Sequence, residues 1–293
     1  MPLISMKEML EDARRRDYAA CYCESWNLES LQAVMEAAEA ERSPIIAGFN
    51  GGFLLRSGCG TPERLGYYAS FRAPLARSTV PVAFLLNESD SLEQIEQGIG
   101  LGFEAVMVEN EFLPREEYQP LVERVVTMAH AKGVTVEAQV GHLADGSEGS
   151  EPQPTEPESA RDFARATHID ALGIAVGNVH ILTTGKRAID LDALAKIHAA
   201  VDIPLVLHGG TGIPLEMAPR CVEMGVAKVN FGTVLKQAYL AAIADRLARY
   251  HHPMSPHPFL GMGGENDILL AGREAVKVET VKLLRAFGSA GKA

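Results

Sequence analysis

The stretch Pro81-Val82-Ala83-Phe84-Leu85-Leu86-Asn87-Glu88-Ser89 decides how the rest of the chain is interpreted. Its apolar run has the length of a buried strand, and Ser91-Leu92-Glu93-Gln94 after it has the spacing of a capping box that starts a helix. In parallel α/β architectures, ligands bind where the carboxyl ends of the strands open into the loops. Asn87 and Glu88 are therefore expected at the mouth of any site that this fold forms.

Seven more strand-like apolar segments occur along the chain, and helical patterns separate nearly all of them. This rhythm predicts right-handed βαβ units that close into an α/β fold, the (β/α)₈ TIM barrel. A doubly wound open sheet is the alternative, but it predicts a glycine-rich phosphate turn after the first strand, where the chain has Cys23-Glu24-Ser25-Trp26. The predicted strands are 19–23, 44–48, 80–86, 105–109, 134–139, 171–176, 204–208 and 227–231.

The connections add three expectations. Ser5-Met6-Lys7-Glu8 has capping-box spacing, so an opening helix through about Arg16 is predicted to cover the bottom of the barrel. The connection 141–159 is rich in Gly, Ser, Pro and acidic residues, which predicts a mobile lid or, alternatively, a solvated excursion without a role. Residues 1–293 are predicted to form one domain, with an irregular arm and a final helix at about 250–293.

Composition limits the partners of the chain. With 293 residues, 47% apolar and 22% charged, it fits one large α/β domain. A net charge of −11 argues against nucleic acid or an anionic membrane as a partner. No apolar run approaches the roughly 18 to 20 residues of a membrane helix, so a cytoplasmic protein is expected. No paired metal spacing occurs among the four cysteines, which are predicted to be reduced and mostly buried: Cys21, Cys23, Cys59 and Cys221.

Two histidines follow consecutive predicted strands, His180 after the sixth and His208 after the seventh. A single histidine at a strand end is more often a structural group than a ligand. Two of them would face one another across the mouth of a barrel, and Glu88 would complete a site of two histidines and one carboxylate for a divalent ion. The sequence therefore predicts a metal site at these three residues.

Glycine-bearing loops follow the seventh and eighth strands. Such loops turn backbone N–H groups toward an anion, and a following helix N-terminus adds favourable partial charge. Phosphate bound between these two loops recurs in barrels, although simple turn glycines are the alternative. The predicted phosphate contacts are Gly209, Gly210, Thr211 and Gly212 in the first loop and Asn230, Gly232 and Thr233 in the second.

These residues belong to a longer pattern that resembles the class II, metal-dependent fructose- and tagatose-bisphosphate aldolases. The likeness runs almost end to end through Pro81-Val82-Ala83, Gly177-Asn178-Val179-His180, Leu207 to Gly212, Lys228-Val229-Asn230 and Phe287 to Ala293. It implies a barrel, an aldehyde-lyase activity on a small-molecule sugar phosphate, a zinc or other divalent ion, and a homodimer or homotetramer. Arg273 on the last helix is then an expected anion contact, across an interface if the chain assembles.

The chain departs from that pattern at its reacting groups. Where the family has Asp-His, as acid/base and zinc ligand, the chain has Asn87-Glu88. In the family's Val-Glu-Ala-Glu-Leu-Gly motif the second glutamate can also bind metal, and here that position is Gln139. The proton-abstracting glutamate of the next loop is replaced, with a one-residue shift, by Glu148. Asn87, Glu88 and Glu148 are thus the expected catalytic residues. The glycine that follows the zinc histidine in the family is Ile181 here.

Three hypotheses follow from these departures. The first is an aldolase-type lyase whose ion is held by Glu88, His180 and His208; an anionic oxygen ligand there favours manganese or magnesium over zinc. The second is altered chemistry on the same scaffold, such as an isomerase, an epimerase or a lyase that uses Lys228 as a Schiff base. The third is a non-catalytic sugar-phosphate-binding protein. Because Asn87 cannot carry a proton, little activity on fructose 1,6-bisphosphate is expected.

Overall fold

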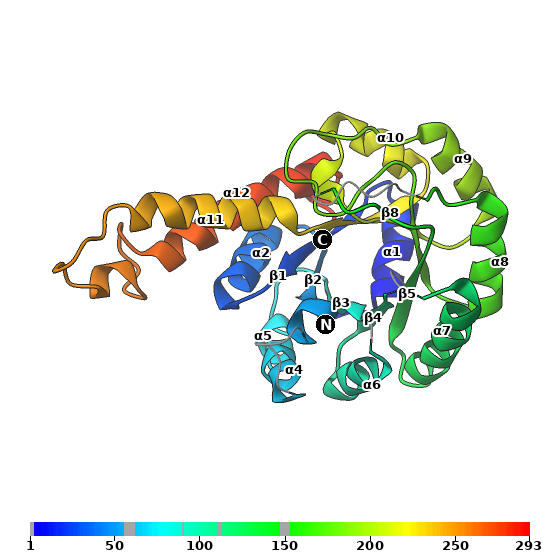
Figure 1. Cartoon of the computed structure of the whole chain (residues 1–293), viewed down its shortest axis with the longest axis horizontal. Helices are drawn as coiled ribbons and strands as arrows, with labels where there is room; N and C mark the ends of the chain where they lie inside the picture. Colours follow the sequence, from blue (N-terminus) through cyan, green and yellow to red (C-terminus); the bar gives the residue numbers. More distant parts are fainter. Residues whose placement is uncertain (1–2, 56–61, 90, 110–112, 147–152) are drawn as a thin grey trace.

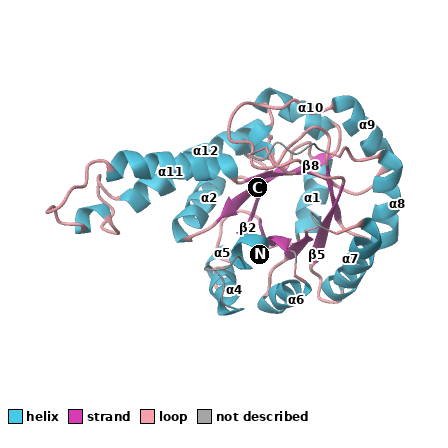
Figure 2. Ribbon diagram, in the orientation of Figure 1, coloured by secondary structure: helices cyan, strands magenta, loops and turns pink. Residues whose placement is uncertain are grey.

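Eight parallel strands close into a barrel in chain order, from β1 beside β2 to β8 beside β1 (Figures 1 and 2). The computed structural model describes residues 3–55, 62–89, 91–109, 113–146 and 153–293. All eight predicted strands are present, so the (β/α)₈ barrel is confirmed and the open sheet is excluded. The strands are β1 Ala20–Ser25, β2 Ile45–Asn50, β3 Val82–Ser89, β4 Ala105–Val108, β5 Thr135–Val140, β6 Ala171–Ile174, β7 Leu205–Leu207 and β8 Val226–Phe231.

Helices surround the barrel, and several begin at capping side chains that the sequence indicates. Asn27 accepts a hydrogen bond from the backbone N–H of Ser30, and Ser91 accepts one from Gln94. The helices are α1 Met6–Arg15, α2 Leu28–Glu41, α3 Gly51–Leu55, α4 Pro62–Ala69, α5 Arg72–Leu75, α6 Leu92–Leu101, α7 Arg115–His130, α8 Pro157–Thr167, α9 Leu191–Ala200, α10 Ala218–Glu223, α11 Thr233–Leu247 and α12 Ile268–Ala286, with short 3-10 turns at Gly210–Gly212, Leu215–Met217 and His257–Phe259.

Helix α1 closes the bottom of the barrel, as predicted. Its side chains Met6, Met9 and Leu10 are buried within the barrel's interior cluster. They fit because many inward-facing strand residues there are small. The space that these small side chains leave is filled by the methionines, as close packing of the interior requires. The predicted capping box at Ser5 is wrong, because the Ser5 hydroxyl lies 3.0 Å from the Thr135 hydroxyl and makes no cap bond. The small inward-facing residues are Ala20, Ala83, Ala105, Ala171 and Ala227.

A second core fills the space between the strands and the helices. It includes Cys21 and Cys23, which alternate with the inward-facing residues of β1 and so face the helix layer. Together with Cys221 they are buried free thiols, as predicted, whereas Cys59 lies outside the described residues. Among the described residues, no helix combines the length and hydrophobicity that spanning a membrane requires. The cytoplasmic location expected from the sequence stays a prediction.

Helices α11 and α12 form an arm that projects from one side of the barrel (Figure 1). They pack against each other, and α12 also packs against α2. Residues 248–267 connect them at the far end of the arm. The predicted irregular segment and final helix are therefore both present, while the division of 1–293 into a single domain remains an interpretation.

Candidate functional site

The end of β3 contains an irregularity that turns two neighbouring side chains toward the same cavity. Strand alternation makes Asn87 face inward after Ala83 and Leu85, and would turn Glu88 outward. The register with β4 shifts between Leu86 and Ser89, however, and Glu88 has φ +50°. A bulge of this kind re-aims a side chain, and a left-handed non-glycine residue costs about 1–2 kcal/mol. Asn87 and Glu88 both line the cavity as a result.

Glu88, His180 and His208 converge, with one potential ligand atom of each lying within 4.8 Å of the others. His208 Nδ1 lies 3.4 Å from Glu88 Oε1, and neither this atom nor the buried His180 Nε2 has a hydrogen-bond partner among the described residues. Two unpartnered imidazole nitrogens aimed at a carboxylate are the donor set that a divalent transition ion prefers. The residues therefore fit the ion that the sequence predicts.

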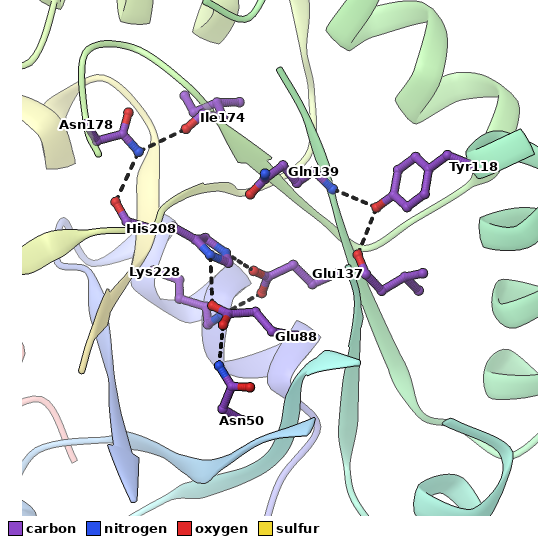
Figure 3. Close-up of polar contacts among 10 residues, drawn as sticks. Asn50, Glu88, Tyr118, Glu137, Gln139, Ile174, Asn178, His208 and Lys228 are labelled. Carbon is purple, nitrogen blue, oxygen red and sulfur yellow. Dashed lines mark hydrogen bonds and ion pairs between the residues drawn. The ribbon is translucent and has the colours of Figure 1, made fainter. Parts of the chain in front are cut away.

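Buried charges hold His208 in place (Figure 3). His208 Nε2 lies 2.9 Å from Glu137 Oε1, and Lys228 Nζ donates to Glu137 Oε2 at 2.6 Å. Burial opposes charge on the imidazole, but the hydrogen bond to Glu137 and the negative charges of Glu137 and Glu88 raise the pKa of His208 to about 9. Glu88 in turn accepts a hydrogen bond from Asn50. With Nε2–H donated to Glu137, the Nδ1 atom of His208 is the one that faces the cluster.

Lys228 has a structural partner rather than a free amine. Its side chain is fully buried and ion-paired with Glu137, and it does not line the cavity. Despite burial, Lys228 and His208 lower the pKa of Glu137 below its ordinary value, so the carboxylate is ionised. The Schiff-base alternative has no support in this arrangement.

The cavity has a volume of about 690 Å³ and lies at the carboxyl ends of the strands, beside the two glycine-bearing loops. At Gly209, φ is +66° and a Cβ atom would overlap the carbonyl oxygen of Val179, so only glycine fits. The Thr211 hydroxyl accepts a hydrogen bond from Val234 N–H in the first turn of α11 at 3.1 Å, which joins the two loops. The N-terminus of α11 is thereby held at the cavity wall.

The structure brings most of the predicted phosphate residues to this wall. Gly210 and Gly212 are buried, with Gly210 behind the wall against Phe231. Arg273 forms an ion pair with Glu36 of α2 and does not line the cavity within this chain. The predicted residues that line the cavity are Gly209, Thr211, Asn230, Gly232 and Thr233.

The sequence also drew attention to Glu148, Gln139 and Ile181. Glu148 lies outside the described residues, so its catalytic role stays a prediction. The base of its loop is fixed, because His180 N–H donates to Ala144 and Gly146 N–H donates to His180. Gln139 does not line the main cavity but a second one of about 470 Å³, where it lies beside Tyr118. Ile181, which replaces the expected glycine, lines the main cavity with φ +47°.

Sequence reasoning missed several residues of the site. Asn50 and Lys236 drew no attention, and Glu137 and Lys228 were not recognised as the support of His208. Strand alternation is the signal that could have found Asn50, because it places Asn50 inward on the same side as Ile46. Lys236 lies on a helix, where the sequence holds no comparable signal.

Comparisons with known proteins agree with this geometry. A sequence model of the family described as fructose-bisphosphate aldolase class-II matches residues 4–292. The chain is 35% identical to the fructose-bisphosphate aldolase of Geobacillus stearothermophilus, with 100% of this chain and 99% of that protein covered. It is 32% identical to the probable fructose-bisphosphate aldolase of Bacillus subtilis (strain 168), with both chains fully covered.

A solved structure shows the same architecture. The crystal structure of the YdjI aldolase from Escherichia coli K12 superposes with a TM-score of 0.81 at 27% sequence identity and covers 99% of both chains. The family is dependent on a divalent metal, which agrees with the cluster of Glu88, His180 and His208. From its sequence, its barrel and the composition of its cavity, the chain belongs to the class II fructose-bisphosphate aldolase family.

Proposed function

We propose that the chain is an aldolase-type carbon–carbon lyase that cleaves a phosphorylated ketose with a divalent ion held by Glu88, His180 and His208. The observation that carries the proposal is the convergence of these three side chains at a cavity whose wall also contains the loops after β7 and β8. An ion at the cluster and a phosphate at Thr211 and the N-terminus of α11 would fix two ends of one ketose.

The residues of the chain prepare the site for cleavage. His208 gives its Nε2–H to Glu137 and presents Nδ1 to the cluster. A bound divalent ion polarises the ketose carbonyl and stabilises the negative charge that develops on its oxygen. Asn87 is buried, and its amide oxygen has no hydrogen-bond partner within the part of the chain that the structure describes. We expect it to hydrogen-bond a substrate hydroxyl without taking its proton.

The ion is expected to be manganese or magnesium rather than zinc. Glu88 supplies an anionic oxygen where the family has a histidine nitrogen, and oxygen ligands favour harder ions. The test is calorimetric titration of chelator-treated protein with Zn²⁺, Mn²⁺ and Mg²⁺. Tight stoichiometric binding that Glu88→Ala abolishes, and that His251→Ala on the exposed arm does not, supports the site. Absence of stoichiometric binding of all three ions would contradict it.

Substrate assays test the reaction itself. The purified protein is incubated with fructose 1,6-bisphosphate, tagatose 1,6-bisphosphate, fructose 1-phosphate and unphosphorylated fructose, with and without chelator, and the released ketone is measured. We expect cleavage of at least one phosphorylated ketose, abolished by chelator, and little turnover of fructose 1,6-bisphosphate. Isomerisation or epimerisation of the ketose without cleavage would favour altered chemistry on the same scaffold.

We also propose a homo-oligomer, a dimer or tetramer, assembled through the α11–α12 arm. More than half of the exposed large apolar side chains among the described residues lie in this arm and the segment that connects its helices. Such a concentration of apolar surface is typical of an interaction site. Light scattering that gives a monomer at micromolar concentration would contradict the proposal. The side chains are Leu240, Leu247, Met254, Leu260, Met262 and Val278.

A further inference from the structure

Carbon–carbon cleavage requires a group that Asn87 cannot replace. When a ketose is split, a base must take the proton of the hydroxyl on the carbon that becomes the aldehyde. The family has an aspartate at the position of Asn87, and an amide accepts no proton at neutral pH. The inference below rests on the proposed lyase function and identifies the missing base. The carboxylates that line the cavity, among the described residues, are Glu24, Glu88, Glu109 and Asp145.

Glu88 is one of the three residues proposed to bind the ion. Its Oε1 faces His208, and its Oε2 accepts the hydrogen bond from Asn50. A carboxylate that coordinates an ion has no free basic oxygen of ordinary strength, because the cation draws on the same electrons. Asp145 forms a backbone bridge with His180, on the loop that leads to the part of the chain outside the described residues. Glu24 and Glu109 remain on the rigid strand ends.

Glu24 is held in a defined orientation at the end of β1. It follows Ala20 and Tyr22 on the inward face, and its side chain is 11% exposed. Its Oε1 accepts a hydrogen bond from Lys236 Nζ at 2.6 Å. Its Oε2 stands over Gly232, where a Cβ atom would overlap it. Glycine at 232 therefore leaves room for the second carboxylate oxygen at the phosphate wall of the cavity.

Lys236 is in turn fixed by aromatic rings. Its Nζ lies 4.5 Å from the ring centre of Phe53 and 5.8 Å from that of Trp26, distances at which a cation is attracted to a ring face. Burial raises the pKa of Glu24 above its ordinary value, while Lys236 opposes this effect. A carboxyl group whose pKa is raised is better suited to taking up and returning a proton near neutral pH.

Several buried polar side chains line the same cavity as Glu24 and two of the proposed metal ligands. The Tyr22 hydroxyl, the Asn87 amide oxygen and both side-chain polar atoms of Asn230 are buried without a hydrogen-bond partner among the described residues. All three residues line the cavity. Buried polar groups are normally paired, so their common orientation indicates a ligand rich in hydroxyl groups at this place.

We propose that Glu24 is the acid/base group of carbon–carbon cleavage in this chain. Its Oε2 takes the proton from the C4 hydroxyl of a ketose, the C4–O bond becomes the aldehyde double bond, and the C3–C4 bond breaks. The electron pair of that bond passes to C3 and the C2 carbonyl oxygen, giving an enediolate. Water protonates C3 to complete the ketone product, and the proton on Glu24 passes to the hydroxide that remains, which restores the carboxylate. In the condensation direction the protonated Glu24 gives its proton to the aldehyde oxygen.

Glu24→Gln tests the proposal because it keeps the shape of the side chain and removes its basicity. On the phosphorylated ketose that the wild type cleaves, kcat is expected to fall about 10² to 10⁴-fold. Exchange of the C3 hydrogen of dihydroxyacetone phosphate for deuterium, followed by NMR, needs no C4 hydroxyl base. We therefore expect it to stay within a few-fold of wild type, with unchanged metal content.

A rescue experiment separates a chemical role from a structural one. Asn87→Asp in the Glu24→Gln background restores a carboxylate where the family has one, and we expect it to recover cleavage at least tenfold. Cleavage by Glu24→Gln within threefold of wild type would overturn the proposal, as would a larger loss for Glu109→Gln. Equal loss of cleavage and exchange in Glu24→Gln would do so too. If the wild type itself neither cleaves nor exchanges with any ketose phosphate, the lyase function fails first.

Discussion

Lys228→Met is expected to be among the most damaging single substitutions in this chain. Lys228 and Glu137 are both fully buried, with 2.6 Å between Nζ and Oε2. The substitution keeps most of the side-chain volume but leaves the Glu137 carboxylate buried with His208 as its remaining partner. Removing one half of a buried ion pair costs about 3–5 kcal/mol. Because Glu137 orients His208, metal affinity should also fall about 10- to 100-fold.

The double substitution Glu137→Gln with Lys228→Met isolates the cause. It removes both charges, while the glutamine oxygen still accepts the Nε2–H of His208. We expect it to recover more than half of the stability and metal affinity lost in Lys228→Met. Lys7→Met is the matched control, because Lys7 pairs with Asp170 at 3.1 Å with its own side chain 53% exposed. It should cost no more than about 1 kcal/mol.

Urea unfolding of metal-free protein and calorimetric metal titration supply the two measurements. If the free energy of unfolding of Lys228→Met lies within about 1 kcal/mol of that of the wild type, the buried ion pair does not stabilise the fold as expected. If the double variant is no better than the single one, the unpaired carboxylate is not the cause of the loss. Either result would refute the reasoning.

Three further predictions concern the site and its frame. The double substitution Asn87→Asp with Glu88→His should raise zinc affinity and increase cleavage of fructose 1,6-bisphosphate in a coupled assay; no gain would show that these positions do not limit the reaction. Thr211→Val should weaken binding of phosphorylated ketoses about fivefold, as expected for one hydrogen bond, and leave unphosphorylated ketoses unaffected in calorimetry. Asp267 accepts N–H groups at the start of α12, and although burial opposes charge these bonds lower its pKa. Its contribution, about 1 kcal/mol, is therefore present above the unfolded pKa of about 3.9 and lost as the pH falls through the folded value. Asp267→Ala should lower the free energy of unfolding at pH 7 and leave it unchanged near pH 2, as measured by urea unfolding at both pH values.

The barrel could be predicted because its signals are local. Apolar runs of strand length end at polar residues, and caps such as Asn27 mark the following helices. Ser5 shows where local reasoning fails: its spacing is that of a cap, but a tertiary partner, Thr135, lies closer to its hydroxyl. A sequence pattern cannot rank a local partner against one that lies 130 positions away.

The site was less predictable because it depends on backbone irregularity. Alternation would turn Asn87 and Glu88 to opposite faces, and only the shifted register and the left-handed φ of Glu88 bring them together. The support of His208 was missed for another reason. Glu137 and Lys228 meet across the barrel from β5 and β8, and a pairing between strands so far apart in sequence leaves no local signal.

Charge balance connects the departures of this chain from its family. A divalent ion bound by Glu88 and by the neutral forms of His180 and His208 would have a net charge of +1, whereas three neutral histidines would leave +2. The ketose carbonyl would therefore be polarised less. Removing the aspartate at position 87 keeps a second negative charge from standing directly beside Glu88, where like charges would raise the pKa of one of them. A base at another position in the cavity then needs a counter-charge of its own. Glu24 meets this requirement, because it reaches the cavity from β1 and its carboxylate is ion-paired with Lys236.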